Sequence, residues 1–102
     1  MIKILLVCGV GASTGFMAQH MRRYAKENNI DAEISAVSKS ELMDYVEDID
    51  VLLIGPHYKA EEATIQKQVA SYNVKAEIIK PEYYATMDGE NILKQAINLY
   101  NS

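Results

Sequence analysis

The stretch Ile2-Lys3-Ile4-Leu5-Leu6-Val7-Cys8-Gly9-Val10-Gly11-Ala12-Ser13-Thr14 decides the fold of this chain. Its first six residues form an apolar run interrupted only by Lys3, which is typical of a buried strand. Two glycines then allow the backbone to turn tightly, and the apolar residues from Thr14 to about Asn28 recur at helical spacing. The sequence therefore predicts a buried strand, a loop of small residues and a helix in direct succession.

The same alternation of strand and helix repeats three more times along the chain. We expect strands at Ala32–Val37, Val51–Ile54 and Lys75–Lys80, and helices from Ser38 to about Glu47, from about Ala60 to Tyr72, and from the N-cap Asp88 onward. Such an order predicts an α/β fold with a four-stranded parallel sheet and helices on both faces. The first and third strands are apolar throughout and the other two carry charges, so the expected strand order is 2-1-3-4. This architecture is Rossmann-like and similar to that of low-molecular-weight tyrosine phosphatases.

Composition and charge exclude several classes of function. The chain has 102 residues, and we expect residues 1–102 to form one domain. Its formal charge is −4 and its ten basic residues are scattered, which disfavours binding to nucleic acid or to an anionic membrane. One cysteine makes neither an internal disulfide nor a multi-cysteine metal site, and the N-terminal apolar run is too short for a signal peptide or a membrane span. We expect a monomeric cytoplasmic domain without membrane insertion.

The loop after the first strand carries the candidate chemistry. In a 2-1-3-4 sheet the ligand crevice lies beyond the carboxyl ends of strands one and three, where loops 8–14 and 55–59 meet. A glycine nest and a helix N-terminus there would lower the pKa of the Cys8 thiol and hold a phosphoryl group. The predicted phosphate cradle consists of Gly9, Val10, Gly11, Ala12, Ser13 and Thr14. A lone cysteine is more often a small buried hydrophobe, but its coincidence with glycines and hydroxyls at a switch point favours a nucleophile.

Four aromatic residues are candidates for the rim of this crevice. His57 falls in the second loop, where its ring could approach a phosphocysteine, and Tyr58, Tyr83 and Tyr84 could line the same rim and contact protein partners. The alternatives are an ordinary exposed loop histidine and tyrosines that simply pack over loop backbone. Spacing alone leaves both interpretations open.

The Cys8 loop resembles a known family. The pattern strand–Cys8-x-x-Gly11-x-Ser13-Thr14–helix resembles the IIB component of the lactose/cellobiose/chitobiose branch of the bacterial sugar phosphotransferase system. Leu53-Ile54-Gly55-Pro56, Tyr84 and Asp88-Gly89 extend the likeness over nearly the whole chain. The resemblance implies that Cys8 accepts a phosphoryl group from a histidine of the IIA protein and passes it to a sugar bound by the membrane protein IIC, with no metal or organic cofactor. Many relatives have Met where Ala12 stands, a departure that removes no hydrogen-bond donor.

Two other classes of protein fit the same loop less well. A low-molecular-weight phosphatase needs Cys-x5-Arg to grip the phosphate, and Thr14 occupies the arginine position; an arsenate reductase needs a second cysteine. A non-enzymatic receiver or anion-sensing module places an aspartate at the end of a strand, whereas Asp50 precedes the third strand. The sequence thus favours a phosphoryl carrier over a hydrolase or a sensor.

Overall fold

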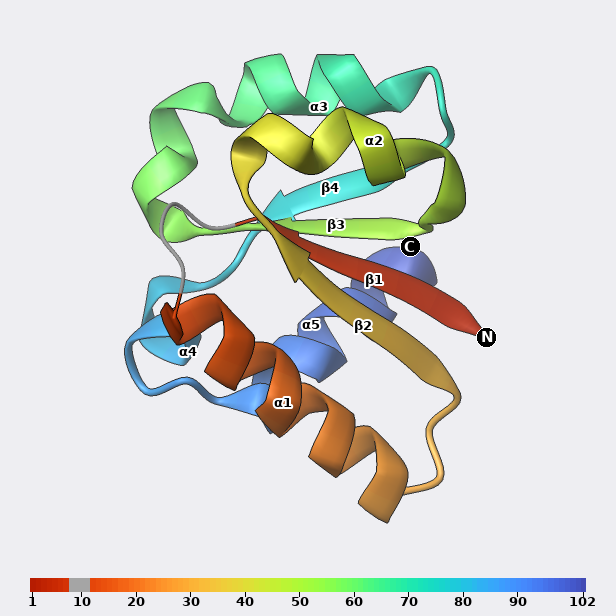
Figure 1. The fold of residues 1–102 in the computed structure, drawn as a ribbon, viewed down its shortest axis with the longest axis vertical. Helices are drawn as coiled ribbons and strands as arrows, with labels where there is room; N and C mark the ends of the chain where they lie inside the picture. The colour runs from red at the N-terminus through yellow and green to blue at the C-terminus, as the bar shows by residue number, and fades with distance from the viewer. Residues whose placement is uncertain (8–11) are drawn as a thin grey trace.

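The computed structural model describes the backbone of residues 1–7 and 12–102 and the side chains of residues 1–7 and 15–102. Four strands alternate with helices in chain order (Figure 1). The strands are β1 (Ile2–Val7), β2 (Ala32–Val37), β3 (Val51–Ile54) and β4 (Lys75–Ile78). The α-helices are α1 (Ala12–Glu27), α2 (Leu42–Tyr45), α3 (Glu62–Ala70), α4 (Pro81–Ala85) and α5 (Gly89–Tyr100). No helix in this described part of the chain combines the length and the apolar character needed to cross a membrane.

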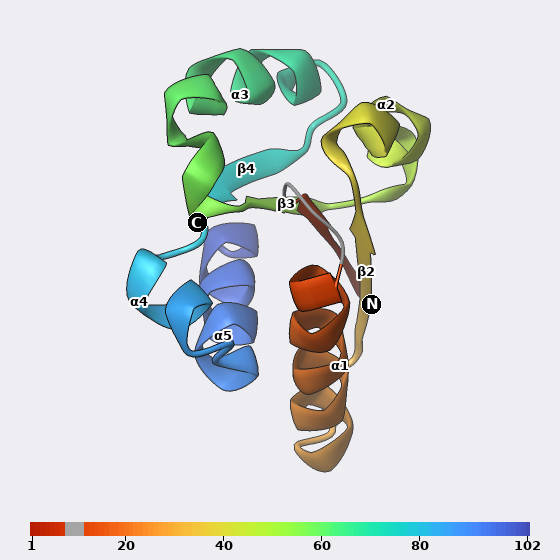
Figure 2. The same ribbon diagram turned by 60° about the vertical axis from the view of Figure 1, so that its left-hand side comes forward.

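The strands form one parallel sheet in the order β2-β1-β3-β4, which confirms the predicted topology. In the register of the two central strands, Leu6 of β1 lies beside Leu53 of β3. Helices α2 and α3 cover one face of the sheet, and α1 and α5 cover the other (Figures 1 and 2). The predicted α/β fold with helices on both faces is therefore correct.

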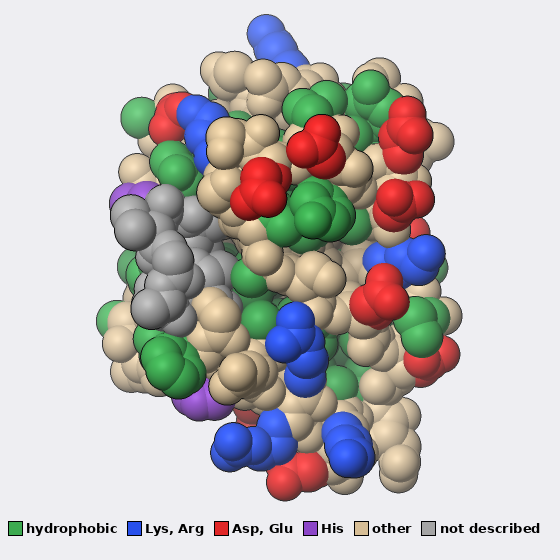
Figure 3. All heavy atoms as spheres, viewed as in Figure 1, with side chains coloured by type: hydrophobic (Ala, Val, Ile, Leu, Met, Phe, Trp, Pro, Cys, Tyr) green, Lys and Arg blue, Asp and Glu red, His purple; other side chains and the backbone are tan. Residues whose placement is uncertain are grey.

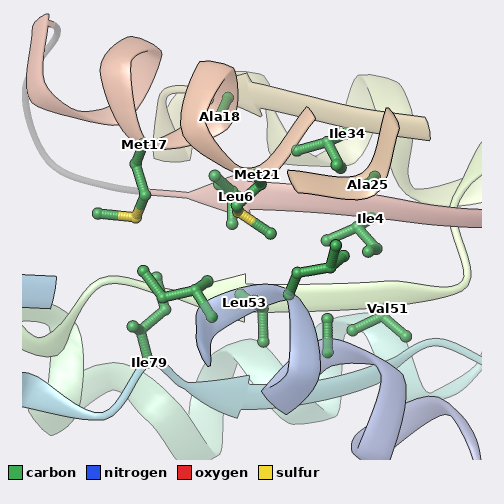
Figure 4. Close-up of a cluster of buried hydrophobic side chains, with 13 residues drawn as sticks. Ile4, Leu6, Met17, Ala18, Met21, Ala25, Ile34, Val51, Leu53 and Ile79 are labelled. Carbon is green, nitrogen blue, oxygen red and sulfur yellow. The ribbon is translucent and has the colours of Figure 1, made fainter. Parts of the chain in front are cut away.

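Each face of the sheet has its own buried apolar cluster, because successive side chains of a strand point to opposite faces. In β1, Ile4 and Leu6 belong to the cluster on the α1 and α5 side, and Leu5 and Val7 to the other. The first cluster includes Met17 and Met21 of α1, which point toward the sheet in Figure 4. All four residues of β3 are fully buried. Burial on both faces explains why β1 and β3 read as continuous apolar runs.

Several element boundaries differ from the sequence-based expectation. Helix α1 begins at Ala12 rather than Thr14. The expected helix after β2 is divided into a 3-10 turn at Lys39–Glu41, the single turn of α2, and a second 3-10 turn at Val46–Asp48. The third helix is likewise preceded by 3-10 turns at Pro56–Glu61. These short helical pieces leave the predicted strand order unchanged.

The end of β4 differs more clearly. The strand stops at Ile78 rather than Lys80. The Lys80 backbone N–H faces the outer edge of the sheet and donates to the side-chain oxygen of Gln95 (3.2 Å), and Pro81 has no N–H with which to extend the ladder to β3. Pro81 then starts the short helix α4, which the sequence analysis did not predict, and proline is favoured at that first position.

Side chains also cover the two outer strands of the sheet. Arg22 of α1 donates from Nε and Nη2 to the backbone carbonyl of Ile34 in β2 (2.9 and 2.7 Å). On the opposite edge, Gln66 donates to the Ala76 carbonyl (3.0 Å) and Gln95 to the Ile78 carbonyl (2.8 Å). These bonds occupy edge carbonyls that would otherwise be open to pairing with another strand.

Candidate functional site

The candidate site lies at the carboxyl ends of the strands, where β1 and β3 lie side by side. The Gly55 backbone N–H donates to the Val7 carbonyl at 2.8 Å, and the Ile79 N–H donates to the Ile54 carbonyl at 2.8 Å. These bonds continue the ladder past the last strand residues and fix where the following segments begin. Cys8 is the residue after Val7, so the chain enters the predicted loop at the switch point of the sheet.

The predicted nucleophile and most of its cradle fall on residues that the structure does not describe. Cys8, Gly9, Val10 and Gly11 lie outside the described residues. Ala12, Ser13 and Thr14 fall in the first turn of α1, of which the backbone is described. The roles assigned to these seven residues remain predictions, and the described structure supplies the two elements on either side of residues 8–11, β1 and α1 (Figure 1).

The segment after β3 brings three of the four predicted rim residues together. The Tyr58 backbone N–H donates to the Gly55 carbonyl (2.9 Å), which closes a turn directly after the strand. Within it the His57 side chain is exposed, and its ring centroid lies 4.6 Å from that of Tyr58 and 6.0 Å from that of Tyr84. Tyr84 arrives from α4, so rings that follow β3 and β4 meet at one edge of the sheet. Their place in the fold agrees with the prediction, and their chemical role remains a proposal.

Two charged residues of this edge were missed by the sequence analysis. Lys39, in the 3-10 turn after β2, forms an ion pair with Glu61, which ends the 3-10 segment after β3. The ammonium group of Lys39 also lies 5.4 Å from the centroid of the Tyr58 ring, a cation–π distance. The sequence feature that could have indicated these two residues is their position, because both follow the carboxyl ends of predicted strands. Their separation of 22 residues carries no local pairing pattern.

Tyr83 takes a different place from its neighbour Tyr84. It lines an open hollow of about 490 Å³ between β4 and α5, together with Lys80, Asn98 and other residues. The Lys80 ammonium lies 5.7 Å from the Tyr83 ring centroid. Gln95 borders the same hollow but is itself buried, and it donates to both Glu77 and the Ile78 carbonyl. Tyr84 of α4 therefore lies at the candidate site, whereas Tyr83, which was also predicted for the rim, lies at a separate surface.

Charge is unevenly distributed on the face shown in Figure 3. Acidic side chains gather on the side of α2 and α3, and Lys and Arg side chains gather toward α1. The exposed acidic residues of the α2 region are Glu41, Asp44, Glu47 and Asp48. Among residues 1–7 and 15–102, no three His, Asp or Glu side chains are grouped so as to hold a metal ion.

Fold and site together define a class: α/β proteins in which a cysteine directly follows the first strand of a 2-1-3-4 parallel sheet and precedes a helix. Comparison with known families narrows this class. The model of the family described as "PTS system, Lactose/Cellobiose specific IIB subunit" matches residues 3–95, and the chain belongs to that family. The resemblance drawn from the Cys8 loop is therefore confirmed, and the chain is a sugar-specific IIB component of this phosphotransferase class.

Individual relatives agree with this assignment. The chain is 34% identical over 99 residues to the "PTS system oligo-beta-mannoside-specific EIIB component" of Bacillus subtilis, covering 97% of this chain and 96% of the relative. It is 22% identical over 74 residues to the "PTS system lactose-specific EIICB component" of Lacticaseibacillus casei, covering 72% of this chain and 13% of the relative. The solution structure of the cellobiose-specific phosphotransferase IIB component from Borrelia burgdorferi superposes with a TM-score of 0.81 at 37% identity, covering 98% of this chain and 92% of that one.

Proposed function

We propose that this chain is a phosphoryl carrier in which Cys8 accepts a phosphoryl group from a phosphohistidine of a IIA protein and passes it to a sugar bound by a membrane IIC protein. The observation that carries the proposal is the position of the single cysteine, directly after β1 at the switch point of the sheet, in a chain of the IIB family. The sugar is of the lactose/cellobiose/chitobiose class.

Each transfer exchanges one bond to phosphorus for another. The Cys8 thiolate attacks the phosphorus, the S–P bond forms, and the N–P bond to the donor histidine breaks, leaving neutral imidazole once a proton is taken up. In the second transfer a sugar hydroxyl attacks, the O–P bond forms, the S–P bond breaks and the thiolate is restored, while the hydroxyl proton leaves to a base. Backbone N–H groups of residues 9–14 and the hydroxyls of Ser13 and Thr14 are proposed to stabilise the phosphoryl oxygens in both steps.

The described residues support the electrostatic side of this mechanism. Helix α1 has 16 residues and begins at Ala12, so its N-terminal N–H groups and its dipole lie immediately after the cysteine loop. Its first turn contains no acidic residue that would oppose an incoming anion. His57, Tyr58 and Tyr84 are proposed to line one side of the phosphoryl site, because their rings meet where β3 and β4 end.

Partners and location follow from the same proposal. A relative whose name joins IIC and IIB in one component, the EIICB protein, supports a IIC protein as the acceptor partner. The donor is proposed to be a separate IIA protein, and this chain to act as a single domain, 1–102, in the cytoplasm.

The test is the mass of the protein after incubation with a phosphorylated IIA protein. We expect a gain of one phosphoryl group, located on Cys8 by peptide mapping, which persists until membranes that contain IIC and a candidate sugar are added. Cys8→Ser is expected to abolish this gain while its circular dichroism spectrum stays unchanged. Phosphate on another residue, or fast loss of phosphate to water with turnover of an aryl phosphate, would contradict the carrier function and favour a hydrolase.

A further inference from the structure

We propose that Lys39 and Glu61 are positioning residues for phosphoryl transfer: their ion pair holds the turn after β3 against the strand that leads to Cys8. This inference rests on the proposed carrier function and adds two residues that neither the loop motif nor the family match assigns.

The ion pair joins the segments that follow the two strands flanking β1. Lys39 follows β2 and Glu61 ends the 3-10 segment after β3, and the strand order places β1 between them. Both side chains are partly exposed, with relative exposures of 39% for Lys39 and 42% for Glu61. A contact across the end of β1 between two long, partly exposed side chains is well placed to set the geometry of the loop edge and poorly placed to contribute much stability.

A series of contacts leads from this pair to the residue before Cys8. The Lys39 ammonium lies 5.4 Å from the Tyr58 ring centroid. The Tyr58 N–H donates to the Gly55 carbonyl (2.9 Å), and the Gly55 N–H donates to the Val7 carbonyl (2.8 Å). Tyr58 is also half-buried against the apolar cluster on the α2 and α3 face. Each link is a directional contact, so the orientation of the turn depends on where Lys39 holds the Tyr58 ring.

The turn also carries His57, which gives the pair a route to the reaction. His57 precedes Tyr58 and its ring lies 4.6 Å from the Tyr58 ring. If the turn relaxes, the rim moves relative to Cys8 and the reacting atoms lose alignment, which slows transfer without removing any group that contacts phosphate. A misplacement of about 1 Å can slow a reaction by roughly 100-fold, so partial relaxation is expected to slow transfer about tenfold.

Four variants test this role. Lys39→Met and Glu61→Gln each remove one charge, and the double variant K39E/E61K exchanges the two charges. The exchange places a carboxylate and an ammonium in contact at the same point, so it preserves the tie between the strand ends. Lys94→Met is the matched control, because Lys94 pairs with Glu90 at 2.9 Å and lies 5.9 Å from the Tyr24 ring centroid, both away from the candidate site.

The assay measures the rate of Cys8 phosphorylation against the concentration of phosphorylated IIA protein. We expect Lys39→Met and Glu61→Gln to lower the maximal rate about tenfold at an unchanged half-saturating donor concentration. The K39E/E61K variant should regain most of the rate, and Lys94→Met should match the wild type. All four variants should keep the wild-type melting temperature within a few degrees, because exposed ion pairs contribute little stability.

Three results would overturn this proposal alone, and a fourth would overturn the carrier function on which it rests. Wild-type maximal rates in both single variants would show that the pair positions nothing. A raised half-saturating concentration at an unchanged maximal rate would place Lys39 in donor docking instead, and a charge exchange as slow as the single variants would mean that the Lys39 charge itself is required. A wild-type protein that gains no phosphate on Cys8 would refute the carrier function itself. The wild-type measurement therefore distinguishes failure of the carrier function from failure of the positioning role.

Discussion

Replacement of Gly89 by alanine should weaken the contact between α1 and α5. Gly89 is the first residue of α5 and is buried against α1. A Cβ atom at this position would lie 2.7 Å from the backbone carbon and from the Cβ of His20, and 2.8 Å from the backbone N of Met21. These are atoms of a helix backbone or attached directly to it, so rotation of a side chain cannot relieve the overlap. His20 Nδ1 also lies 3.1 Å from the Met87 carbonyl, which ties the same two segments together.

The size of the effect follows from the overlap. An ordinary Cβ contact starts at 3.4 Å, so the helices must separate by about 0.7 Å at this point. Separation loosens the cluster around Met21 and Ile92, and overpacking of this kind costs about 2 kcal/mol. For a domain of this size that free energy corresponds to a fall in melting temperature of roughly 10 °C.

Gly15→Ala is the matched control for this substitution. Gly15 lies inside α1 and a Cβ there has no neighbour within 4 Å. Alanine in a helix interior is favoured over glycine by about 0.5–1 kcal/mol, so this variant should melt several degrees higher than the wild type. Chemical and thermal unfolding of both variants test the argument. A Gly89→Ala protein as stable as the wild type would show that the two helices are not held at this separation.

Two further substitutions test the cap of α5 and the edge of the sheet. Asp88→Ala should cost about 1 kcal/mol, because the Asp88 carboxylate accepts from the Asn91 backbone and side-chain N–H groups (3.1 and 2.7 Å). The same Asn91 bonds lower the pKa of Asp88, so the carboxylate stabilises the fold fully above the ordinary carboxyl pKa and loses this effect as the pH falls below about 4. In urea unfolding, the difference in free energy of unfolding between wild type and variant should therefore be smaller at pH 2.5 than at pH 7. Arg22→Met should cost about 1 kcal/mol, because it removes the two bonds to the Ile34 carbonyl. Arg23 is exposed and has no hydrogen-bond or ion-pair partner among the described residues, so Arg23→Met is the control and should unfold at the wild-type denaturant concentration.

The topology could be predicted because it follows from burial patterns that are local in sequence. Runs such as Val51–Ile54 are apolar at every position, and only a strand covered on both faces needs that pattern. The N-cap Asp88 was predicted for a similar reason, because an N-cap side chain bonds to a backbone N–H only three residues later in the sequence. The strand order then followed from which runs carry charge.

The features that escaped prediction depend on contacts between distant segments. Helix α4 has five residues, too few for a periodic pattern, and the Lys80 N–H beyond β4 finds its partner in Gln95, a residue of α5 that lies 15 positions away. The Lys39–Glu61 pair likewise joins two strand ends that only the folded sheet brings together. Arg22 is an exposed residue of α1, and its bonds to β2 depend on the register of α1 against the sheet, which the sequence does not show.

Stability and phosphoryl transfer are expected to depend on different residues of this fold. The two apolar clusters lie on the faces of the sheet, and their main residues, such as Leu6 and Leu52, are completely buried. The residues proposed to shape the reaction stand at the carboxyl edge, where His57 is exposed and Lys39 partly exposed. Substitutions at Gly89 or Arg22 should therefore lower the free energy of unfolding more than the transfer rate of the folded protein, and Lys39→Met should do the reverse. Measuring the free energy of unfolding and the transfer rate on every variant tests this separation directly. If the rate fell in proportion to the stability in all of them, the apolar clusters alone would determine the geometry of the carboxyl edge.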